Sequence, residues 1–415
     1  MRYLIIGNSA AGISAAKAIR RKDTDGEIII FSDEPYPYYS RLLITYFIMG
    51  SIERSQLFEG TERLLHDYNI QTILETEIIE ISPQESKITC IDGHQFSFDK
   101  LLIATGSSPT VLDIPGKNLP GVFKVRTLED AERIGERLLP GRHAIILGCG
   151  LVGLQMIQAL FRKGMKVTGI VASDRILSRT LDQEASRLIK SVVEEQGIKI
   201  ILRRQVNEIV KGDGETLWVV LNDGKKIKGD LVIMAKGVAP RTELLRQAKL
   251  SFAYGALVNN HLQTSRESIY AAGDVVECYD LIYEDRKINA IWPNAIEEGF
   301  VAGLNMSGSD VGYQGGIGMN VTEFFGVKMA SIGMIEADNG SREIVSLNPE
   351  KPIYKKAIYK DGRIRGAIFL GEISNIGLFH RLIKAKISMP EDNVEKIMNL
   401  SAGIPNAPDL LKYND

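Results

Sequence analysis

Two glycine-rich turns of one type stand in two similar segments of the chain. Residues Gly7–Gly12 read GNSAAG, and residues Gly148–Gly153 read GCGLVG. Glycine at the first position allows a tight turn, and the last glycine lets a helix and a strand pack closely. A small residue at the middle position, Ser9 or Gly150, lets a pyrophosphate approach the backbone. The turns are therefore typical of dinucleotide binding.

The elements that must position these turns are a strand before each turn and a helix after it. The two segments read RYLIIGNSAAGISAAKAI and HAIILGCGLVGLQMIQAL. In each, a short apolar run suits a buried parallel strand, and apolar residues at helical spacing follow the turn. One such motif is weak evidence and also occurs in unrelated α/β folds, but the repeat predicts two bound dinucleotides.

Three further apolar runs end in glycine-containing turns. They read LLIATGSSP, LVIMAKGVAPRTELL and SIYAAGDVVE, and they place Ala104–Gly106, Gly237 and Gly273–Asp274 directly after predicted strands. Because ligands of open α/β sheets bind outside the carboxyl ends of the strands, we expect these turns to line the binding sites.

The pattern changes after about Gly315. The segments MNVTEFFGVKMASIGMIE and YKKAIYKDGRIRGAIFLG alternate in polarity, with a turn at Asp361-Gly362, and NIGLFHRLIKAKI has helical spacing. We predict a small antiparallel α+β unit followed by a loosely held tail, AGIPNAPDLLKYND.

Composition excludes several classes of protein. The chain has 415 residues, 44% of them hydrophobic and 25% charged, which predicts a multidomain globular protein. Its net charge is −2, which argues against nucleic acid or an anionic membrane as the main partner. No membrane span or secretory signal is recognisable. Cys90, Cys149 and Cys278 form no CxxC pair, and with five histidines they provide no metal-ligand spacing. A reducing, cytoplasmic location is expected.

The ordered motifs resemble those of the two-dinucleotide flavoprotein reductases in the pyridine-nucleotide–disulfide oxidoreductase superfamily. The resemblance extends over nearly the whole chain and rests on the GxSAAG, ATG, GxGLVG, GVAP and YAAGD motifs. The segment Tyr36–Phe47, YPYYSRLLITYF, is similar to the PYYSRPLLSYY-type segment of NAD(P)H:rubredoxin reductases and of the flavin module of assimilatory nitrite reductases.

The resemblance implies an α/β fold of two Rossmann-like domains, one inserted in the other, and a C-terminal α+β interface domain. The expected FAD-binding domain comprises residues 1–117 and 247–315. The NAD(P)H-binding domain would comprise residues 118–246, and the interface domain residues 316–415.

The resemblance also implies the FAD-binding residues. Asp33 would bind the adenosine ribose, as an acid about 20 residues beyond the turn should, with Glu34 as the alternative. Arg41 and Arg126 would lie near the flavin and its phosphates, Asp274 would hold the ribityl chain, and Trp292 would either line the isoalloxazine or belong to the core. The full set is Gly7, Ser9, Ala10, Ala11, Gly12, Asp33, Glu34, Arg41, Ala104, Thr105, Gly106, Arg126, Gly273, Asp274 and Trp292.

For NAD(P)H, the resemblance implies Gly148, Gly150, Leu151, Val152, Gly153, Val171, Ser173, Arg175 and Gly237. Relatives that read VTLVEMAPRILP place a glutamate at the end of the second strand, where it binds the 2′-hydroxyl of NADH. This chain reads VTGIVASDRILS, with Val171 at that position and Asp174 three residues later. A 2′-phosphate would meet less repulsion here and would find Ser173 and Arg175 nearby, so the pattern favours NADH only slightly.

The expected chemistry uses no catalytic side chain, because the flavin N5 is the reactive centre and the protein positions the reactants. Disulfide reductases of the superfamily discharge the reduced flavin through a cysteine pair, and its NADH peroxidases and oxidases through a single cysteine. Here Arg41 stands about where a single cysteine would be, and Tyr46 replaces the lysine of another carrier-reductase type. The histidine–glutamate pair of dithiol enzymes is not apparent, and His380 lies in an amphipathic pattern typical of packing.

The resulting hypothesis is an FAD-dependent NAD(P)H oxidoreductase that passes electrons to an iron–sulfur carrier of rubredoxin or ferredoxin type. The alternatives are an electron-transfer subunit of a larger iron–sulfur complex, a cysteine-independent NADH oxidase, and a flavin-bound signalling protein. The acceptor, the direction of electron flow and the oligomeric state stay open, and a homodimer is one option.

Overall fold

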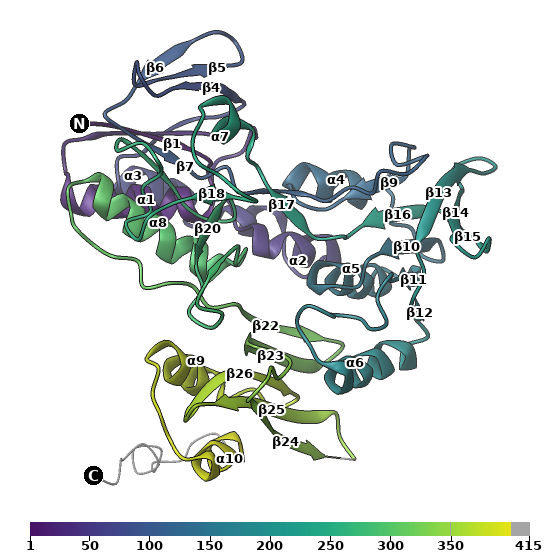
Figure 1. Cartoon of the computed structure of the whole chain (residues 1–415). Coiled ribbons are helices and arrows are strands. Elements are labelled where there is room, and N and C mark those ends of the chain that lie inside the picture. Colours follow the sequence, from purple (N-terminus) through teal and green to yellow (C-terminus); the bar gives the residue numbers. More distant parts are fainter. Residues whose placement is uncertain (349, 400–415) are drawn as a thin grey trace. The chain divides into compact units, whose positions relative to one another are not determined.

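The computed structural model describes residues 1–348 and 350–399, and its internal contacts divide the chain into two units (Figure 1). The first unit comprises Met1–Pro109, Arg126–Ala131 and Val238–Gly316. The second comprises Thr110–Val125, Glu132–Gly237 and the chain from Ile317 onward. The three-domain boundaries that we expect from the sequence stay a prediction.

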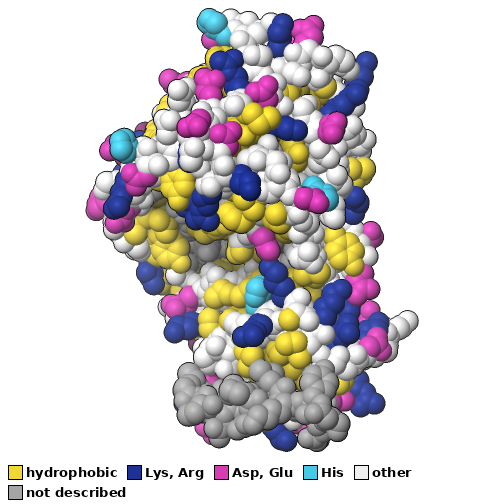
Figure 2. Space-filling model, turned by 90° about the vertical axis from the view of Figure 1, so that its left-hand side faces the viewer, with side chains coloured by type: hydrophobic (Ala, Val, Ile, Leu, Met, Phe, Trp, Pro, Cys, Tyr) yellow, Lys and Arg dark blue, Asp and Glu magenta, His cyan; other side chains and the backbone are white. Residues whose placement is uncertain are grey.

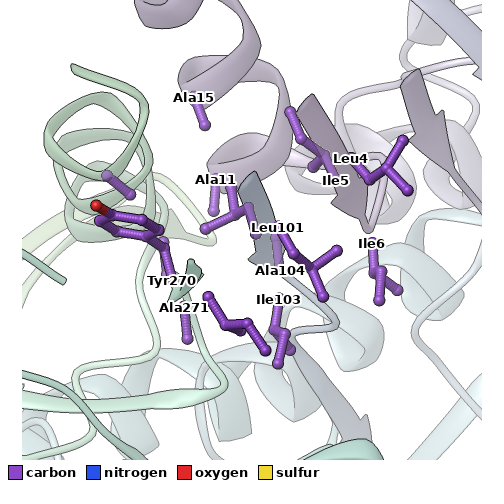
Figure 3. Close-up of a cluster of buried hydrophobic side chains, with 14 of the residues drawn as sticks. Leu4, Ile5, Ile6, Ala11, Ala15, Leu101, Ile103, Ala104, Tyr270 and Ala271 are labelled. Carbon is purple, nitrogen blue, oxygen red and sulfur yellow. The ribbon is translucent and has the colours of Figure 1, made fainter. Parts of the chain in front are cut away.

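A five-stranded parallel sheet forms the centre of the first unit. In spatial order its strands are β19 (Ile269–Ala271), β7 (Lys100–Ile103), β1 (Arg2–Ile6), β2 (Glu27–Phe31) and β3 (Gln71–Ile73). The strands are apolar almost throughout because both faces of a parallel sheet are covered. Figure 3 shows side chains of β1, β7 and β19 meeting Ala11 and Ala15 of helix α1 (Ala10–Lys22) in this core.

Helix α8 (Trp292–Met306) packs against α1 at close range. A Cβ atom at Gly299 would lie 2.1 Å from the carbonyl oxygen of Ala11, and one at Gly303 would lie 2.3 Å from that of Ala15. The hydroxyl of Ser14 donates a hydrogen bond of 2.7 Å to the carbonyl of Ile296. Small residues on both helices therefore permit their approach, which fixes the start of α8 beside the sheet.

Shorter elements complete the first unit. A three-stranded sheet is formed by β4 (Ile78–Ser82), β5 (Lys87–Cys90) and β6 (Gln95–Ser97). The remaining elements are η1 (Arg41–Leu43), α2 (Ile44–Met49), η2 (Arg54–Phe58), α3 (Thr61–Asp67), β8 (Ser107–Pro109), the start of α4 (Leu128–Gly135), β17 (Val238–Pro240), α7 (Glu243–Gln247), β18 (Ala256–Leu257), β20 (Val276–Tyr279) and β21 (Arg286–Lys287).

The second unit contains a parallel sheet of the same design. Its order is β12 (Lys199–Ile201), β11 (Lys166–Ile170), β10 (His143–Leu147), β16 (Leu231–Met234) and β9 (Val122–Lys124). Helix α5 (Leu151–Arg162) follows β10, and α6 (Gln183–Glu195) precedes β12. A small antiparallel sheet is formed by β13 (Val206–Lys211), β14 (Leu217–Leu221) and β15 (Lys226–Gly229).

A five-stranded antiparallel sheet follows at the C-terminal end of the described chain. Its order is β22 (Met319–Phe324), β23 (Val327–Gly333), β26 (Arg363–Leu370), β25 (Ile353–Lys360) and β24 (Arg342–Asn348), with helices α9 (Ile376–Lys384) and α10 (Glu391–Asn399). The predicted turn at Asp361-Gly362 joins β25 and β26, with φ of 50° and 75° at its two residues. The predicted tail lies outside the described residues.

The structure confirms the expected fold class of two Rossmann-like parts and a C-terminal α+β part. No helix in the described residues is long and apolar enough to cross a membrane. On the face shown in Figure 2, basic and acidic side chains are interspersed, which agrees with the net charge of −2.

Candidate functional site

A cavity of about 640 Å³ opens in the first unit beyond the carboxyl ends of β1, β2 and β7. This is where open α/β sheets bind ligands. The cavity lining includes Gly7, Ser9, Asp33, Arg41, Ala104, Thr105, Gly106 and Arg126 from the predicted FAD-binding set. Residues from distant parts of the chain therefore converge on one cavity, as the sequence predicts.

The two glycine turns have the same hydrogen-bonding pattern. The backbone N–H of Gly7 donates to the carbonyl of Phe31 at 2.9 Å, and that of Gly148 donates to the carbonyl of Ile170 at 2.8 Å. In both cases the acceptor is the last residue of the strand that pairs in parallel with the strand before the turn. The repeat seen in the sequence is thus also a repeat of local structure.

The first glycine of each turn is required by backbone geometry. Gly7 has a φ of 121° and Gly148 a φ of 109°, a region that L side chains avoid. A Cβ atom would lie 2.1 Å from the carbonyl oxygen of Ala104 at the first turn and 2.3 Å from that of Ala235 at the second. Both turns therefore depend on glycine here.

The other turn positions behave as the motif requires. A Cβ atom at Gly12 would lie 2.0 Å from the carbonyl oxygen of Gly7. A Cβ atom at Gly153 would lie 1.9 Å from that of Gly148. By contrast, a Cβ atom at Gly150 would meet no heavy atom within 4 Å. This open position leaves room for a ligand at the second turn, and the first turn has the small residue Ser9 at the same place.

An orphaned polar atom indicates that the first cavity is built for a polar ligand. Asn8 Oδ1 is buried and has no hydrogen-bond partner among the described residues, while Nδ2 donates to the carbonyl of Tyr36 at 3.5 Å. A buried acceptor without a partner is costly unless a ligand hydroxyl or N–H satisfies it. Together with the N-terminus of α1, this residue fits a bound dinucleotide such as FAD.

Arg41 is held by a buried polar network at the cavity wall. It forms an ion pair with Glu34, and its Nη1 donates to the hydroxyl of Tyr39 at 3.1 Å and to the carbonyl of Arg126 at 3.2 Å. The Tyr39 hydroxyl donates to Glu34 at 2.7 Å and accepts from the backbone N–H of Leu128 at 3.0 Å. Burial alone would lower the pKa of Arg41, but Tyr39 and Glu34 raise it, so the guanidinium stays charged.

A second cation lines the same cavity. Arg126 Nη2 contacts Asp274 Oδ2 at 3.1 Å, and the hydroxyl of Ser107 donates to the same oxygen at 2.7 Å. Burial lowers the pKa of Arg126, and Asp274 opposes this shift. The pair holds Asp274 close to the cavity, although Asp274 itself is not among its lining residues. Ser107 was not among the predicted site residues.

The two candidate ribose-binding acids have different surroundings. Asp33 lines the cavity, and its Oδ2 accepts from Arg241 Nη1 at 2.7 Å. Glu34 is engaged by Arg41 and Tyr39 and does not line the cavity. The structure therefore favours Asp33 as the candidate ribose ligand. Arg241 lies in the GVAPRT segment, where the chain returns to the first unit after residues 132–237 of the second unit. Its position at this cavity therefore follows from the fold and not from the local sequence.

The remaining predicted FAD residues support the cavity without lining it. Ala10 and Ala11 are buried in the first turn of α1, and Trp292 begins α8 and packs partly buried against the core. Gly273 has a φ of 85°, and its backbone N–H donates to Glu298 Oε2 at 2.7 Å. Sequence reasoning did not find Glu298, because a glutamate in a helical pattern resembles a surface residue.

Glu298 is a deeply buried carboxyl group behind the Gly273-Asp274 turn. It is 4% exposed, and its Oε1 accepts from the Tyr313 hydroxyl at 3.4 Å. Burial raises the pKa of Glu298 to about 8, although the hydrogen bond from Gly273 opposes the shift. At neutral pH the side chain is therefore mostly protonated, and it holds the Gly273-Asp274 turn without adding a full charge.

The three cysteines are the candidate groups for thiol chemistry. Cys90, Cys149 and Cys278 are buried, and none lines the cavity. Burial raises the pKa of Cys149 to about 12 and that of Cys278 well above its usual value. Because the thiolate is the reactive form, these thiols are poor nucleophiles. Among residues 1–348 and 350–399, no three His, Cys, Asp or Glu side chains gather as metal ligands.

The predicted NAD(P)H residues lie in the second glycine turn, at the start of α5 and in the loops after β11 and β16. Leu151 and Val152 form the first turn of α5, and the side chain of Val152 is exposed. Val171 is buried directly after β11, and the hydroxyl of Ser173 donates to the carbonyl of Arg175 at 2.7 Å. Gly237 follows β16 with a φ of 90°.

The guanidinium of Arg175 forms ion pairs and hydrogen bonds within the second unit. It forms an ion pair with Glu336, lies 3.6 Å from Asp174, and donates to the carbonyls of Ser178 and Leu181 at 3.4 Å. Glu336 comes from the segment after β23, which the sequence did not connect to the coenzyme site. A 2′-phosphate would therefore compete with carboxylates for this arginine.

Two glycine turns of the dinucleotide-binding type on parallel sheets, one of them beside a large polar cavity, are the features expected of a two-dinucleotide flavoprotein reductase. A family model described as pyridine nucleotide-disulphide oxidoreductase matches residues 1–299, and a second, described as rubredoxin NAD+ reductase C-terminal domain, matches residues 319–387. The chain belongs to the pyridine nucleotide-disulphide oxidoreductase family. It is an FAD-dependent NAD(P)H oxidoreductase, as the sequence predicts.

Curated relatives support this placement. A protein named NADH oxidase from Methanocaldococcus jannaschii is 31% identical over 88% of this chain and 83% of its own length. The ferredoxin–NAD(+) reductase subunit of a Pseudomonas putida benzene 1,2-dioxygenase system is 27% identical over 99% of this chain and 98% of its own. A nitrite reductase [NAD(P)H] from Bacillus subtilis is 28% identical over 96% of this chain, which spans only 49% of that relative.

Solved structures agree. An NAD-dependent persulfide reductase from A. fulgidus superposes with a TM-score of 0.88 and 28% identity, covering 97% of this chain and 79% of its own. The predicted resemblance to the rubredoxin and nitrite reductase branch is confirmed by the C-terminal family model and by the nitrite reductase relative.

Proposed function

We propose that the protein passes electrons from NAD(P)H through FAD to an iron–sulfur carrier of rubredoxin or ferredoxin type, without a redox-active cysteine. The observation that carries the proposal is the burial of all three thiols away from the cavity. Bound FAD would supply the redox chemistry, namely two-electron uptake from the nicotinamide and one-electron release to the acceptor. The predicted site residues have positioning roles only.

The chain's own groups are suited to holding FAD in place. The first turn and the N-terminus of α1 would bind the pyrophosphate, Asp33 would bind the adenosine ribose, and Asp274 would orient the ribityl chain. Arg41 and Arg126 add positive charge at the cavity wall, each balanced by one carboxylate. Because their partners also fix their geometry, these arginines need little reorganisation when the ligand binds.

The acceptor is inferred from the relatives. One relative is named as a ferredoxin reductase subunit, and the C-terminal family model is named after rubredoxin reductase. Anaerobic reduction of the FAD-loaded protein by NADH, followed by mixing with rubredoxin, ferredoxin or oxygen, tests the proposal. We expect an iron–sulfur carrier to reoxidise the flavin at least tenfold faster than air. Reoxidation by air as fast as by either carrier would favour an NADH oxidase.

A second candidate function is that of an electron-transfer subunit in a larger iron–sulfur complex. It is favoured by the nitrite reductase relative, of which this chain spans about half. Co-purification distinguishes the two candidate functions. A subunit of a complex would co-purify with an iron–sulfur protein at fixed stoichiometry, whereas a separate reductase would not.

We also propose that NADH is the preferred coenzyme. The loop between β11 and α6 begins at Val171 and carries two arginines, Arg175 and Arg179. Arg175 stands four residues after Val171, and Glu336 and Asp174 neutralise it. A 2′-phosphate would have to displace Glu336 to use this guanidinium, which lowers its net gain.

Replacing Glu336 by glutamine is expected to shift the preference toward NADPH. Loss of the ion pair frees Arg175 for a 2′-phosphate, and an exposed pair of this kind is worth up to about 1 kcal/mol, or roughly fivefold in affinity. The ratio of NADPH to NADH dissociation constants measures the shift. Glu372→Gln, which removes a different ion pair of the C-terminal sheet, is the matched control. An unchanged ratio in Glu336→Gln would show that Arg175 does not face the 2′ position.

A further inference from the structure

Lys236 stands at a special position of the internal repeat. The segment Ala235-Lys236-Gly237 follows β16 as Ala104-Thr105-Gly106 follows β7. The backbone N–H of Ala104 donates to the carbonyl of Ile6 at 2.8 Å, and that of Ala235 donates to the carbonyl of Leu147 at 2.9 Å. In the first copy Thr105 lines the FAD cavity. Lys236 therefore occupies the corresponding ligand-facing position of the second copy.

The side chain of Lys236 extends along the second glycine turn. Its Cδ lies 3.5 Å from the position that a Cβ atom of Gly148 would take. Gly150 on the same turn faces open space, because a Cβ atom there would have no heavy atom within 4 Å. An ammonium group beside this opening is within reach of an anion that binds the turn.

The ammonium group of Lys236 has no counter-charge in the described part of the chain. It forms no ion pair or hydrogen bond there, and the nearby Cys149 thiol is protonated at neutral pH. Lys236 is nevertheless partly buried, and this burial lowers its pKa. A desolvated cation without a partner destabilises the protein, so its presence points to an anion that binds here.

A second cation lies close to the same segment. Arg179 Nη1 is 4.0 Å from the position of a Cβ atom at Gly237. Arg179 is exposed and has no ion pair or hydrogen bond among the described residues. Lys236 approaches Gly148 and Arg179 approaches Gly237, so two cations without partners among the described residues lie near the turn and are free to bind a ligand with two negative charges.

We propose that Lys236, with Arg179 beside it, binds the pyrophosphate of NAD(P)H. This inference rests on the proposed use of the second turn for NAD(P)H, and it adds to that turn two residues that the glycine motif does not predict. The glycine turn and the N-terminus of α5 supply N–H groups, whereas Lys236 supplies a full positive charge. The same segment of the first copy has threonine instead, and there Arg41 and Arg126 provide the charge.

Calorimetric titration of the FAD-loaded protein with ADP-ribose tests the proposal, because this probe carries the pyrophosphate without the nicotinamide. We expect Lys236→Met to raise the dissociation constant about tenfold and Arg179→Met about threefold, and Lys236→Arg to keep most of the affinity. The dependence of affinity on salt should also weaken in Lys236→Met. Lys225→Met, which removes an exposed charge of the same unit, should match the wild type.

The melting temperature of the ADP-ribose-free protein distinguishes a ligand-binding role of Lys236 from a structural role. If Lys236 binds the ligand, removal of this unpaired, desolvated cation should leave the melting temperature unchanged or higher. If Lys236 has a structural role, the melting temperature should fall. Wild-type affinity in Lys236→Met, or a loss of affinity that follows a lower melting temperature, would overturn the inference. If wild-type protein binds no ADP-ribose and NADH fails to reduce its flavin, the proposed function itself is wrong, and the inference falls with it.

Discussion

Replacing Gly148 by alanine is expected to destabilise the second unit by about 3 kcal/mol or more and to abolish coenzyme binding. The new Cβ atom would lie 2.3 Å from the carbonyl oxygen of Ala235, and the φ of 109° is unfavourable for alanine. Rotation of a side chain cannot relieve this clash. The backbone fixes the position of the Cβ atom, and the oxygen that it meets is itself a backbone atom. The turn must open, and with it the site for the pyrophosphate.

Gly150→Ser is the matched control, because it introduces the residue that the first turn has at Ser9. We expect a change in unfolding free energy within about 0.5 kcal/mol, since no neighbouring atom lies within 4 Å. Trp218 lies in β14 of the second unit and Trp292 in the first. Urea unfolding followed by Trp218 fluorescence in a Trp292→Phe background therefore reports on the correct unit. Equal destabilisation by both substitutions would contradict the geometry of the turn.

Replacing Glu298 by glutamine is expected to change how stability depends on pH. The pKa of Glu298 is raised from 4.5 to about 8 in the folded protein by burial. Between these two pH values the folded state binds more protons than the unfolded state, so the free energy of unfolding falls as pH rises. The carboxyl group thus costs the wild-type protein about 5 kcal/mol above pH 8, a cost that is absent below pH 4.5.

Glutamine has nearly the same shape and still accepts the hydrogen bond from Gly273. The difference in unfolding free energy between Glu298→Gln and wild type should therefore be near zero at pH 4.5 and should favour the variant increasingly up to pH 8. Subtracting the two proteins cancels the titration of other groups, provided that Asp274, Cys278 and Tyr313 behave alike in both. A difference that does not vary with pH would show that the pKa of Glu298 is not raised.

Local patterns were sufficient to predict the two parallel sheets and their glycine turns. Strand, turn and helix are adjacent in the sequence, and the steric reasons for Gly7, Gly12, Gly148 and Gly153 act within a few residues or on the next strand. The hairpin at Asp361-Gly362 was predictable for the same reason, because its two residues must adopt positive φ values.

Partners that lie far apart in the sequence could not be predicted. Asp33 and Arg241 are 208 residues apart, and their contact exists only because the chain returns to the first unit after the insertion. Glu298 was missed because its burial depends on the close packing of α8 against α1 and on the N–H of Gly273. Lys236 was detectable in principle, since aligning the two copies places AKG opposite ATG.

The central claim is that electrons leave the flavin for a partner protein without a thiol relay. The most direct measurement is the rate of flavin reoxidation by rubredoxin in a variant with Cys90→Ala, Cys149→Ala and Cys278→Ala, after anaerobic reduction by NADH. Flavin absorbance first establishes that the variant carries FAD. We predict a rate constant within about twofold of wild type, because all three thiols are buried away from the cavity. Loss of rubredoxin-dependent reoxidation in the FAD-loaded variant would contradict the claim.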